Sequence, residues 1–374
     1  IAWVFTEESF LKNNSVLSFG KLRSSYGITG NDQIGDYQFL DTYVSSANLY
    51  QGITGLQPSR LFNSDFGWET NRKFESALEM GFFQDRLFFT GAFYINSSSN
   101  QLVGIPLPGT AGFTSLNANL GAEVQNKGFE LTFRTVNFQR NSFEWTTSFN
   151  ISANRSKLLS YPGLESSSNA NRYVIGQSIN ISKLYLYTGV DAQTGVYSFK
   201  DYNNDGLLSI ADRERLVDLN PKYFGGLQNQ LTFKNVQLDF LLQFVKQQAF
   251  SYSTGTPGTL VNQPAGLDYY WKQPDASEDF QKLTSGQNSA ALTAYSRFRT
   301  SDGALEDASY LRLKSISLTY TIPSQVSKDI RCRLYLQGQN LLTFSGYKGG
   351  DPEFKFAGYL PPLKTYTLGL QLTF

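Results

Sequence analysis

One stretch of this sequence spaces its oxygen-bearing side chains as a calcium-binding loop does. It runs from Asp201 to Asp212, and Gly206 stands at the sixth position, where such a loop turns sharply. The twelfth position carries Asp in place of a bidentate Glu, and a shorter carboxylate coordinates the ion less completely. The sequence therefore predicts a structural Ca²⁺ site, with an Asx-rich turn that holds no ion as the alternative. The expected ligands are Asp201, Asn203, Asp205, the carbonyl of Leu207, Ser209 or a water molecule, and Asp212.

Two groups of aromatic residues offer flat faces for stacking against a sugar ring. They are Tyr185 with Tyr187, and Tyr269 with Tyr270 and Trp271, all in segments expected to be loops. Tyr and Trp are enriched where proteins bind their partners, so these five residues are candidates for substrate contact. The alternative, which is the more common role, is that they pack the loops together or lie at a membrane interface.

The residue types that most catalysis needs are missing. The sequence has no His, which removes the usual general base and the commonest transition-metal ligand. Cys332 is the one cysteine, and the neighbouring carboxylates Glu7 and Glu8 fall in a polar turn. Without a nucleophile motif or a phosphate-binding loop, neither enzymatic activity nor an organic cofactor is expected. The 32 basic and 31 acidic side chains balance, so no nucleic-acid partner is expected either.

The elements that would position these residues are strands. From Lys364 to Phe374, apolar residues occupy every second position and small or polar residues lie between them. Successive side chains of a strand point to opposite faces, so one face is apolar and the other polar. Soluble sandwiches and transmembrane barrels both contain such strands. In a barrel, two sets of side chains would face lipid and the interior respectively: Leu336, Phe240, Leu370 and Phe133, and Gln337, Gln243, Gln371 and Thr132.

The lengths of the connections separate these two architectures. Outer-membrane barrels have short periplasmic turns and long extracellular loops, whereas a soluble sandwich does not sort its loops in this way. Charged residues make up only 17% of the chain and aromatics 15%, and no run approaches the ~20 apolar residues of a spanning helix. Short connections alternate with long ones along the chain: 7–14, 84–86, 139–142, 234–236 and 323–330, against 28–66, 97–122, 159–222, 249–307 and 345–362.

The prediction is an all-β protein, an antiparallel transmembrane β-barrel with ten strands and the tail of an eleventh at Ile1 to Phe5. A barrel of ten strands would have a narrow lumen, and the chain opens within a strand. We therefore expect residues 1–374 to form the C-terminal half of a 22-stranded barrel, with any signal peptide upstream.

Several motifs resemble one family. Taken in chain order, they match the C-terminal half of the barrel in SusC/RagA-type TonB-dependent outer-membrane transporters of Bacteroidetes. The matching segments are Lys21 to Asn31 (KLRSSYGITGN), Trp68 to Asn71 (WETN), Asn126 to Leu131 (NKGFEL), Asp201 to Asp212, Asn220 to Gly226 (NPKYFGG), Ala308 to Lys314 (ASYLRLK) and Gln339 to Thr343 (QNLLT). The family's plug domain and first half-barrel have no counterpart in these residues.

This resemblance implies an importer of oligomeric glycans or peptides in the bacterial outer membrane. Its loops would be extracellular, and its short turns and C-terminus periplasmic. A SusD-like surface lipoprotein would cover the barrel, TonB would act through the plug domain, and two such pairs could associate. The terminal aromatic, Phe374, resembles the signal that barrel-assembly machinery recognises. A passive porin and a structural or adhesive surface barrel are the alternatives.

Overall fold

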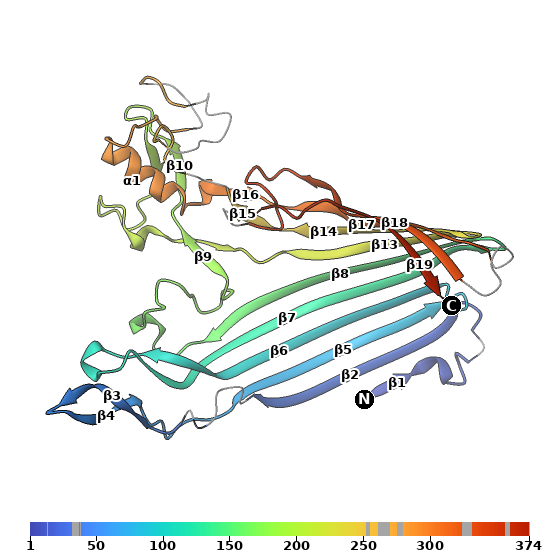
Figure 1. Cartoon of the computed structure of the whole chain (residues 1–374), viewed down its shortest axis with the longest axis horizontal. Helices are drawn as coiled ribbons and strands as arrows, with labels where there is room; N and C mark the ends of the chain where they lie inside the picture. The colour runs from blue at the N-terminus through green and yellow to red at the C-terminus, as the bar shows by residue number, and fades with distance from the viewer. Residues whose placement is uncertain are drawn as a thin grey trace.

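The protein is described by a computed structural model that covers residues 1–12, 14–31, 37, 39–251, 255–260, 270–274, 280–323, 331–355 and 360–373. Its main feature is one sheet of eleven antiparallel strands, in which each strand pairs with the wall strand before it and the one after it in the sequence. The long strands run side by side and curve into a wall (Figure 1). The wall strands are β1 (Ala2–Val4), β2 (Leu17–Asn31), β5 (Glu69–Phe82), β6 (Leu87–Pro106), β7 (Ser115–Arg140), β8 (Phe143–Ser160), β13 (Tyr223–Phe233), β14 (Val236–Lys246), β17 (Tyr310–Thr321), β18 (Arg331–Ser345) and β19 (Thr365–Thr373).

The strand count is confirmed, and so is the alternation of short and long connections except at 97–122. Residues 324–330 of the short connection expected at 323–330 lie outside the described residues. β1 is the eleventh strand expected at the start of the chain, and β1 and β19 are the two edges of the sheet. Tight turns join β5 to β6, β7 to β8 and β13 to β14 at one end of the wall, while the long connections gather at the other end (Figure 1). This is the all-β architecture of a barrel wall with long loops on one side.

The register of the strands confirms which side chains share a face. Leu336 pairs with Leu318 on one side and with Leu368 on the other, and Gln337 pairs with Ser317 and Thr367. Cross-strand partners lie on the same face of a sheet, so the apolar set and the polar set occupy opposite faces. On the apolar face, Leu368 is 79% exposed and Leu336 is 52% exposed.

The expected loop at 97–122 is wrong. β6 and β7 continue through most of it as a two-stranded arm, and only residues 107–114 connect them, with a 3₁₀ turn at η2 (Gly109–Ala111). Gly112 follows this turn with a φ of 75°, in the left-handed region that glycine enters without steric cost. Pro106, Pro108 and Gly109 favour a loop in the sequence, and they mark only the end of this arm.

The other long connections contain smaller elements, as expected for 159–222 and not foreseen for 249–307. Their described residues form four separate two-stranded sheets and a helix, α1 (Ser289–Phe298). The strands are β3 (Thr42–Tyr50), β4 (Ile53–Arg60), β9 (Ile181–Leu184), β10 (Tyr187–Val190), β11 (Tyr197–Phe199), β12 (Arg215–Asp218), β15 (Gln248–Phe250) and β16 (Leu305–Asp307). The described residues also contain short 3₁₀ helices: η1 (Phe5–Glu7), η3 (Leu164–Ser166), η4 (Ile210–Asp212) and η6 (Asp302–Ala304).

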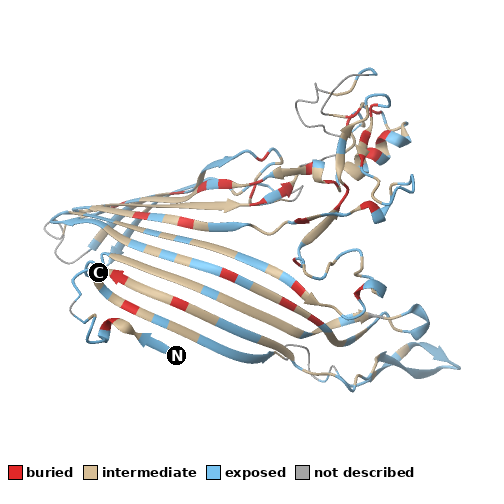
Figure 2. Ribbon diagram, turned by 180° about the vertical axis from the view of Figure 1, so that it is seen from behind, coloured by how far each residue is buried: buried red, intermediate tan, exposed pale blue. Residues whose placement is uncertain are grey.

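Part of these connections folds together beside the long-loop end of the wall. We call the described residues of 181–218 and 270–304 the loop domain; α1 and β9 to β12 belong to it. Buried residues are concentrated there and are sparse along the wall (Figure 2). In the described residues, no helix has both the length and the apolar character needed to cross a membrane.

Candidate functional site

The acidic loop in the loop domain has the turn that its spacing predicts. The carboxylate of Asp201 accepts hydrogen bonds from the backbone N–H groups of Asn204 and Gly206, both at 2.8 Å. Gly206 has a φ of 77°, which makes the sharp turn at the sixth position. The next two acceptors hold the backbone locally, since Asn203 Oδ1 accepts from the N–H of Asp205 at 3.1 Å and Asp205 Oδ1 from that of Leu207 at 2.7 Å.

Asp212 closes this loop from its interior. Its side chain is fully buried and accepts hydrogen bonds from the backbone N–H groups of Tyr202 and Ser209, at 2.9 and 2.7 Å. These bonds, that from Ser209 foremost, lower the pKa of the Asp212 carboxyl despite its burial. Ser209 caps η4 in return, because its hydroxyl accepts the N–H of Ala211 at 3.1 Å.

These bonds bear on the predicted calcium site. Each carboxylate oxygen has two lone pairs, so the oxygens of Asp201 and Asp205 that accept one N–H retain capacity for a cation. In the conformation described, however, no three Asp, Glu or Cys side chains of the described residues are grouped closely enough to hold a metal ion. The turn is therefore established by backbone hydrogen bonds of the protein itself, and Ca²⁺ binding by the six predicted ligands stays a prediction.

The first aromatic group forms the core of the loop domain. Tyr185 is 4% exposed, its ring centroid lies 5.7 Å from that of Phe199, and the Arg213 guanidinium lies 4.8 Å from its ring. Tyr187 meets Phe298 of α1 edge to face at 5.3 Å. A ring as buried as that of Tyr185 has no open face for a sugar, so in this conformation Tyr185 packs the loops together.

Two residues that sequence reasoning missed are central to this core. Tyr197 on β11 is 3% exposed and stacks on Phe298 with ring centroids 4.3 Å apart and planes 18° from parallel. Aromatic pairs at such distances add to the stabilisation that burial alone gives. The signal was present as alternating aromatics in β11 and a spacing of three between Tyr295 and Phe298, but both lie in segments that look like loops.

The second aromatic group lies against the same domain. The ring of Trp271 covers Gly195 so closely that a Cβ atom there would meet it at 2.3 Å, and its Nε1–H donates to the Ala192 carbonyl at 3.2 Å. Tyr270 forms an isolated bridge with Phe280. Tyr269 lies outside the described residues, as does Phe374. Substrate contact by Tyr187, Tyr270 and Trp271 stays a prediction.

A buried charge cluster fixes the last long loop to the wall. Arg312 on β17 is 1% exposed and donates to Glu353 and Asp351 in that loop, and to the hydroxyl of Thr343 on β18 at 3.0 Å. Lys314 donates to both carboxylate oxygens of Glu353 at 3.1 Å. Sequence reasoning missed this cluster, because Arg312 and its acidic partners belong to different elements. Charge-assisted bonds from one buried guanidinium to two carboxylates hold the loop against the polar face of the wall.

Charged side chains of the neighbouring strands β2 and β5 form ion pairs with one another. The Arg23 guanidinium bonds to Glu75 and to Glu79, with a distance of 3.0 Å from its Nε to Glu79 Oε1. Lys21 lies 4.0 Å from the second oxygen of Glu79. These ion pairs join β2 to β5.

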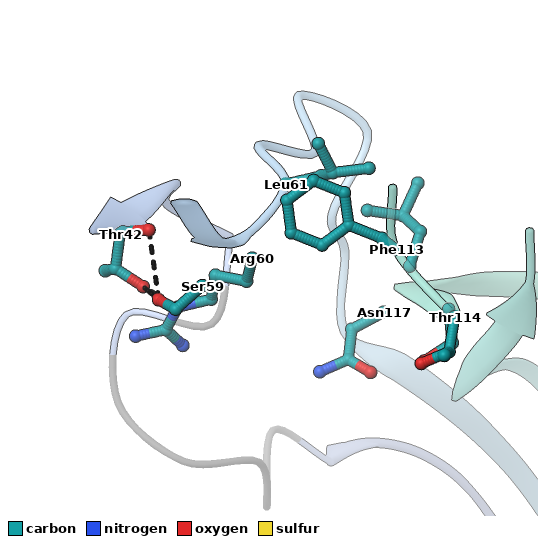
Figure 3. Close-up of a pocket in the computed structure, with 9 residues that line it drawn as sticks. Thr42, Ser59, Arg60, Leu61, Phe113, Thr114 and Asn117 are labelled. Atoms are coloured by element: carbon teal, nitrogen blue, oxygen red, sulfur yellow. Dashed lines mark hydrogen bonds between the residues drawn. The ribbon is translucent and has the colours of Figure 1, made fainter. Parts of the chain in front are cut away.

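A cleft of about 510 Å³ lies between the hairpin β3–β4 and the arm of β6 and β7 (Figure 3). Hydroxyl groups and one guanidinium line its hairpin side, where Arg60 Nε donates to Thr42 Oγ1 at 2.8 Å. The base of the hairpin is held to the arm, because Asn63 donates to the Asn117 carbonyl at 3.0 Å. The lining residues are Thr42, Ser59, Arg60, Leu61, Phe113, Thr114, Ser115, Leu116 and Asn117.

Comparisons with known proteins cover the whole chain. No protein-family model matches it. It is 28% identical to TonB-dependent receptor P3 of Formosa agariphila and 27% identical to TonB-dependent receptor SusC of Bacteroides thetaiotaomicron, over all of this chain and 41% and 39% of those proteins. The solved RagAB peptide transporter superposes with a TM-score of 0.82 at 27% identity, over all of this chain and 43% of that one. The chain spans about two fifths of the length of the relatives it matches.

Proposed function

Because the chain is a SusC/RagA-like β-barrel segment, similar along its whole length to TonB-dependent receptors, we propose that it forms part of an active outer-membrane importer of oligomeric nutrients, either peptides or glycans. One observation carries the proposal. The eleven strands, the short turns and the loop domain together superpose on a peptide transporter with a TM-score of 0.82, so the likeness includes the loops as well as the wall.

We further propose that these residues are the C-terminal half of a 22-stranded barrel in the outer membrane of a Bacteroidetes-like bacterium. The long loops would face outward, and a SusD-like lipoprotein would rest on them. TonB would supply energy through a plug domain in another part of the protein, and two transporter–lipoprotein pairs could associate. The support is the similarity to SusC and to RagAB.

The test is uptake by the bacterium that carries the protein. Deleting the gene should abolish growth on one class of oligomer, peptide or glycan, while growth on the corresponding monomers persists. Restoring the whole protein should restore growth, and disabling TonB should remove it again. Uptake that continues without TonB would indicate a passive porin, and an unchanged uptake after deletion would indicate a structural or adhesive barrel.

The partners are tested by purification from the native membrane under mild detergent. A lipoprotein that copurifies at one copy per transporter supports the lid, and a complex with two of each supports the paired assembly. A transporter that purifies alone after crosslinking in intact cells would contradict the lid.

We also propose that the barrel-assembly machinery recognises Phe374. Deleting Phe374, or replacing it with Asp, should reduce the amount of heat-resistant barrel in the outer membrane. Unchanged amounts in that variant would contradict the proposal.

A further inference from the structure

The apolar face of the wall carries a chain of hydrogen-bonded polar side chains that a lipid-facing surface does not need. Thr135 donates to Asn137 Oδ1 at 2.7 Å, and Asn137 Nδ2 donates to Thr147 Oγ1 at 2.6 Å. Asn229 Oδ1 then accepts both the Thr147 hydroxyl at 2.7 Å and Trp145 Nε1–H at 2.9 Å. These hydrogen-bonded side chains come from three neighbouring strands, β7, β8 and β13.

The register places these hydrogen-bonded side chains on the face that would meet lipid under the proposed function. Thr147 pairs with Thr135 on β7 and with Asn229 on β13. Two residues further along β8 on the same face, Phe149 pairs with Phe133, one of the side chains expected to face lipid. An irregularity between Val136 and Phe138 leaves one extra residue, Asn137, without a cross-strand partner. This bulge lets the Asn137 amide reach Thr147 on the apolar face.

One N–H group at the exposed end of this series of side chains is left available for a hydrogen bond. An amide nitrogen carries two N–H groups, and Asn137 donates one of them to Thr147. Asn137 is exposed, and the described residues give its second N–H no acceptor. In hydrocarbon an unpaired N–H is costly, so this position favours a ligand that brings oxygen acceptors and apolar chains together.

Three cationic side chains lie near these hydrogen-bonded residues, at the short-turn end of the wall. The guanidinium of Arg86 lies 3.4 Å from the carbonyl of Val136, next to Asn137. Lys234 lies over the ring of Phe233 at 5.6 Å, and its backbone N–H bonds to Ser142 in the neighbouring turn. Arg140 ends β7 opposite Phe143. All three cations are exposed.

Two acidic residues lie nearby and do not cancel these cations. Asp85, in the same turn as Arg86, accepts a hydrogen bond from Ser18 on the far side of β5, at 2.8 Å. Glu144 pairs with Thr232 and alternates with Phe143 and Trp145, so it lies on the opposite face of the wall. By the same alternation, Arg86 lies on the opposite face, because it precedes Leu87, which pairs with Thr135. The positive rim of the face that carries the polar side chains therefore consists of Arg140 and Lys234.

We propose that this surface binds one glycerophospholipid. Its phosphate would lie between Arg140 and Lys234, and its ester oxygens would accept from Asn137. Its acyl chains would run along the apolar face beyond Thr147, past Phe133 and Phe149. Asn137 precedes the turn at Asn141 by four residues, about 10 Å along a tilted strand, which matches the depth between phosphate and acyl chains. The lipid orientation rests on the proposed function; in that orientation the site lies in the inner leaflet.

The experiment counts phospholipids retained by the whole protein, purified in mild detergent, by native mass spectrometry. Phosphatidylglycerol and phosphatidylethanolamine are added back, and diacylglycerol, which lacks the phosphate, serves as the comparison lipid. We expect retention of one phospholipid and no retention of diacylglycerol. Arg140→Gln with Lys234→Gln should weaken retention about tenfold, and Thr135→Val with Asn137→Leu should weaken it severalfold.

The matched control is Arg331→Gln, which removes an exposed cation at the same end of the wall, on β18. Heat-modified mobility on gels reports folding for every variant, and only folded variants are compared. The proposal is overturned if the control loses lipid as the test variants do, or if diacylglycerol binds equally. It is also overturned if the variants change association between barrels while lipid retention stays at wild-type level. Cargo uptake is measured separately, because it tests the proposed function and not this site.

Discussion

The barrel wall and the loop domain place their large side chains in opposite ways. On the wall, Leu368 and Leu370 are 79% and 57% exposed, whereas in the loop domain Tyr197 and Phe199 are 3% and 9% exposed. The wall is held by backbone hydrogen bonds between strands, and one of its faces exposes apolar side chains. The loop domain buries its aromatic residues as a water-soluble protein does. Large apolar side chains are therefore exposed in one region and buried in the other, so the same substitution has different consequences in the two regions.

The substitution with the largest expected effect destabilises the loop domain and leaves the wall folded. Tyr197→Ala removes the ring that stacks on Phe298, and deleting a buried aromatic costs about 3–5 kcal/mol. We expect hydrogen exchange and proteolysis to increase throughout the loop domain, while the wall keeps its heat-resistant mobility. The control is Tyr50→Ala, because Tyr50 is 78% exposed on the β3–β4 hairpin. Equal effects of the two substitutions would show that the aromatic core does not stabilise the loops.

The next effect tests whether the outer face of the wall meets lipid. Leu336→Arg places a charge on the apolar face, at a cost of about 2–4 kcal/mol if the residue lies near the middle of the membrane. Gln337→Arg places the same charge on the opposite face, between Ser317 and Thr367, at a much smaller cost. Folding into lipid vesicles under increasing urea measures both. If the two variants inserted equally well, the assignment of the faces would be wrong.

A smaller and local effect concerns the predicted calcium loop. Asp201→Ala with Asp205→Ala should increase proteolytic cleavage between residues 190 and 220 severalfold, because the substitutions remove the acceptors of the backbone N–H groups of Asn204, Gly206 and Leu207. Chelation of calcium should have the same effect if an ion orders the loop. Assembly of the wall should not change. The control is Asp218→Ala, which removes an acidic residue of β12 outside the motif.

Calorimetric titration with Ca²⁺ separates the two interpretations of this loop. Binding that the double substitution abolishes supports the site. Cleavage that rises in the double variant without any calcium binding by the wild type would mean that the Asx turns alone order the loop.

The smallest expected effect is a pH dependence where the two regions meet. The Lys246 ammonium donates to Asp307 at 2.6 Å and, with bonds from Ser309, lowers the pKa of the Asp307 carboxyl to about 2. A free Asp has a pKa of about 3.9, so the pair stabilises the fold fully above that value and is lost as the pH falls toward 2. Asp307 is exposed, so the contribution is about 0.2–1 kcal/mol. Hydrogen exchange at β15 and β16 should rise between pH 4 and 2, and Asp307→Asn should remove that pH-dependent part of the rise. A rise of the same size in the variant would mean that other groups cause it.

The features that could be predicted from the sequence are those that depend on residues close together along it. A two-residue period assigns the faces of β18 and β19 without knowledge of the rest of the chain, and short turns such as 84–86 fix which strands are adjacent. The strand count followed from these two patterns. The turn of the acidic loop was also local, because its hydrogen bonds join residues two to five positions apart.

The tertiary structure alone decided where distant residues meet. Arg312 and Glu353 are 41 positions apart, and Trp145 and Asn229 are 84 apart, so no spacing rule relates them. Tyr185 looks the same in sequence whether its ring is open to a ligand or buried. Its burial depends on packing with Phe199 and with Ala294 of α1, which lies more than a hundred positions further along the chain. The arm of β6 and β7 is likewise defined by pairing between strands, because Pro106, Pro108 and Gly109 look like part of a loop in the sequence.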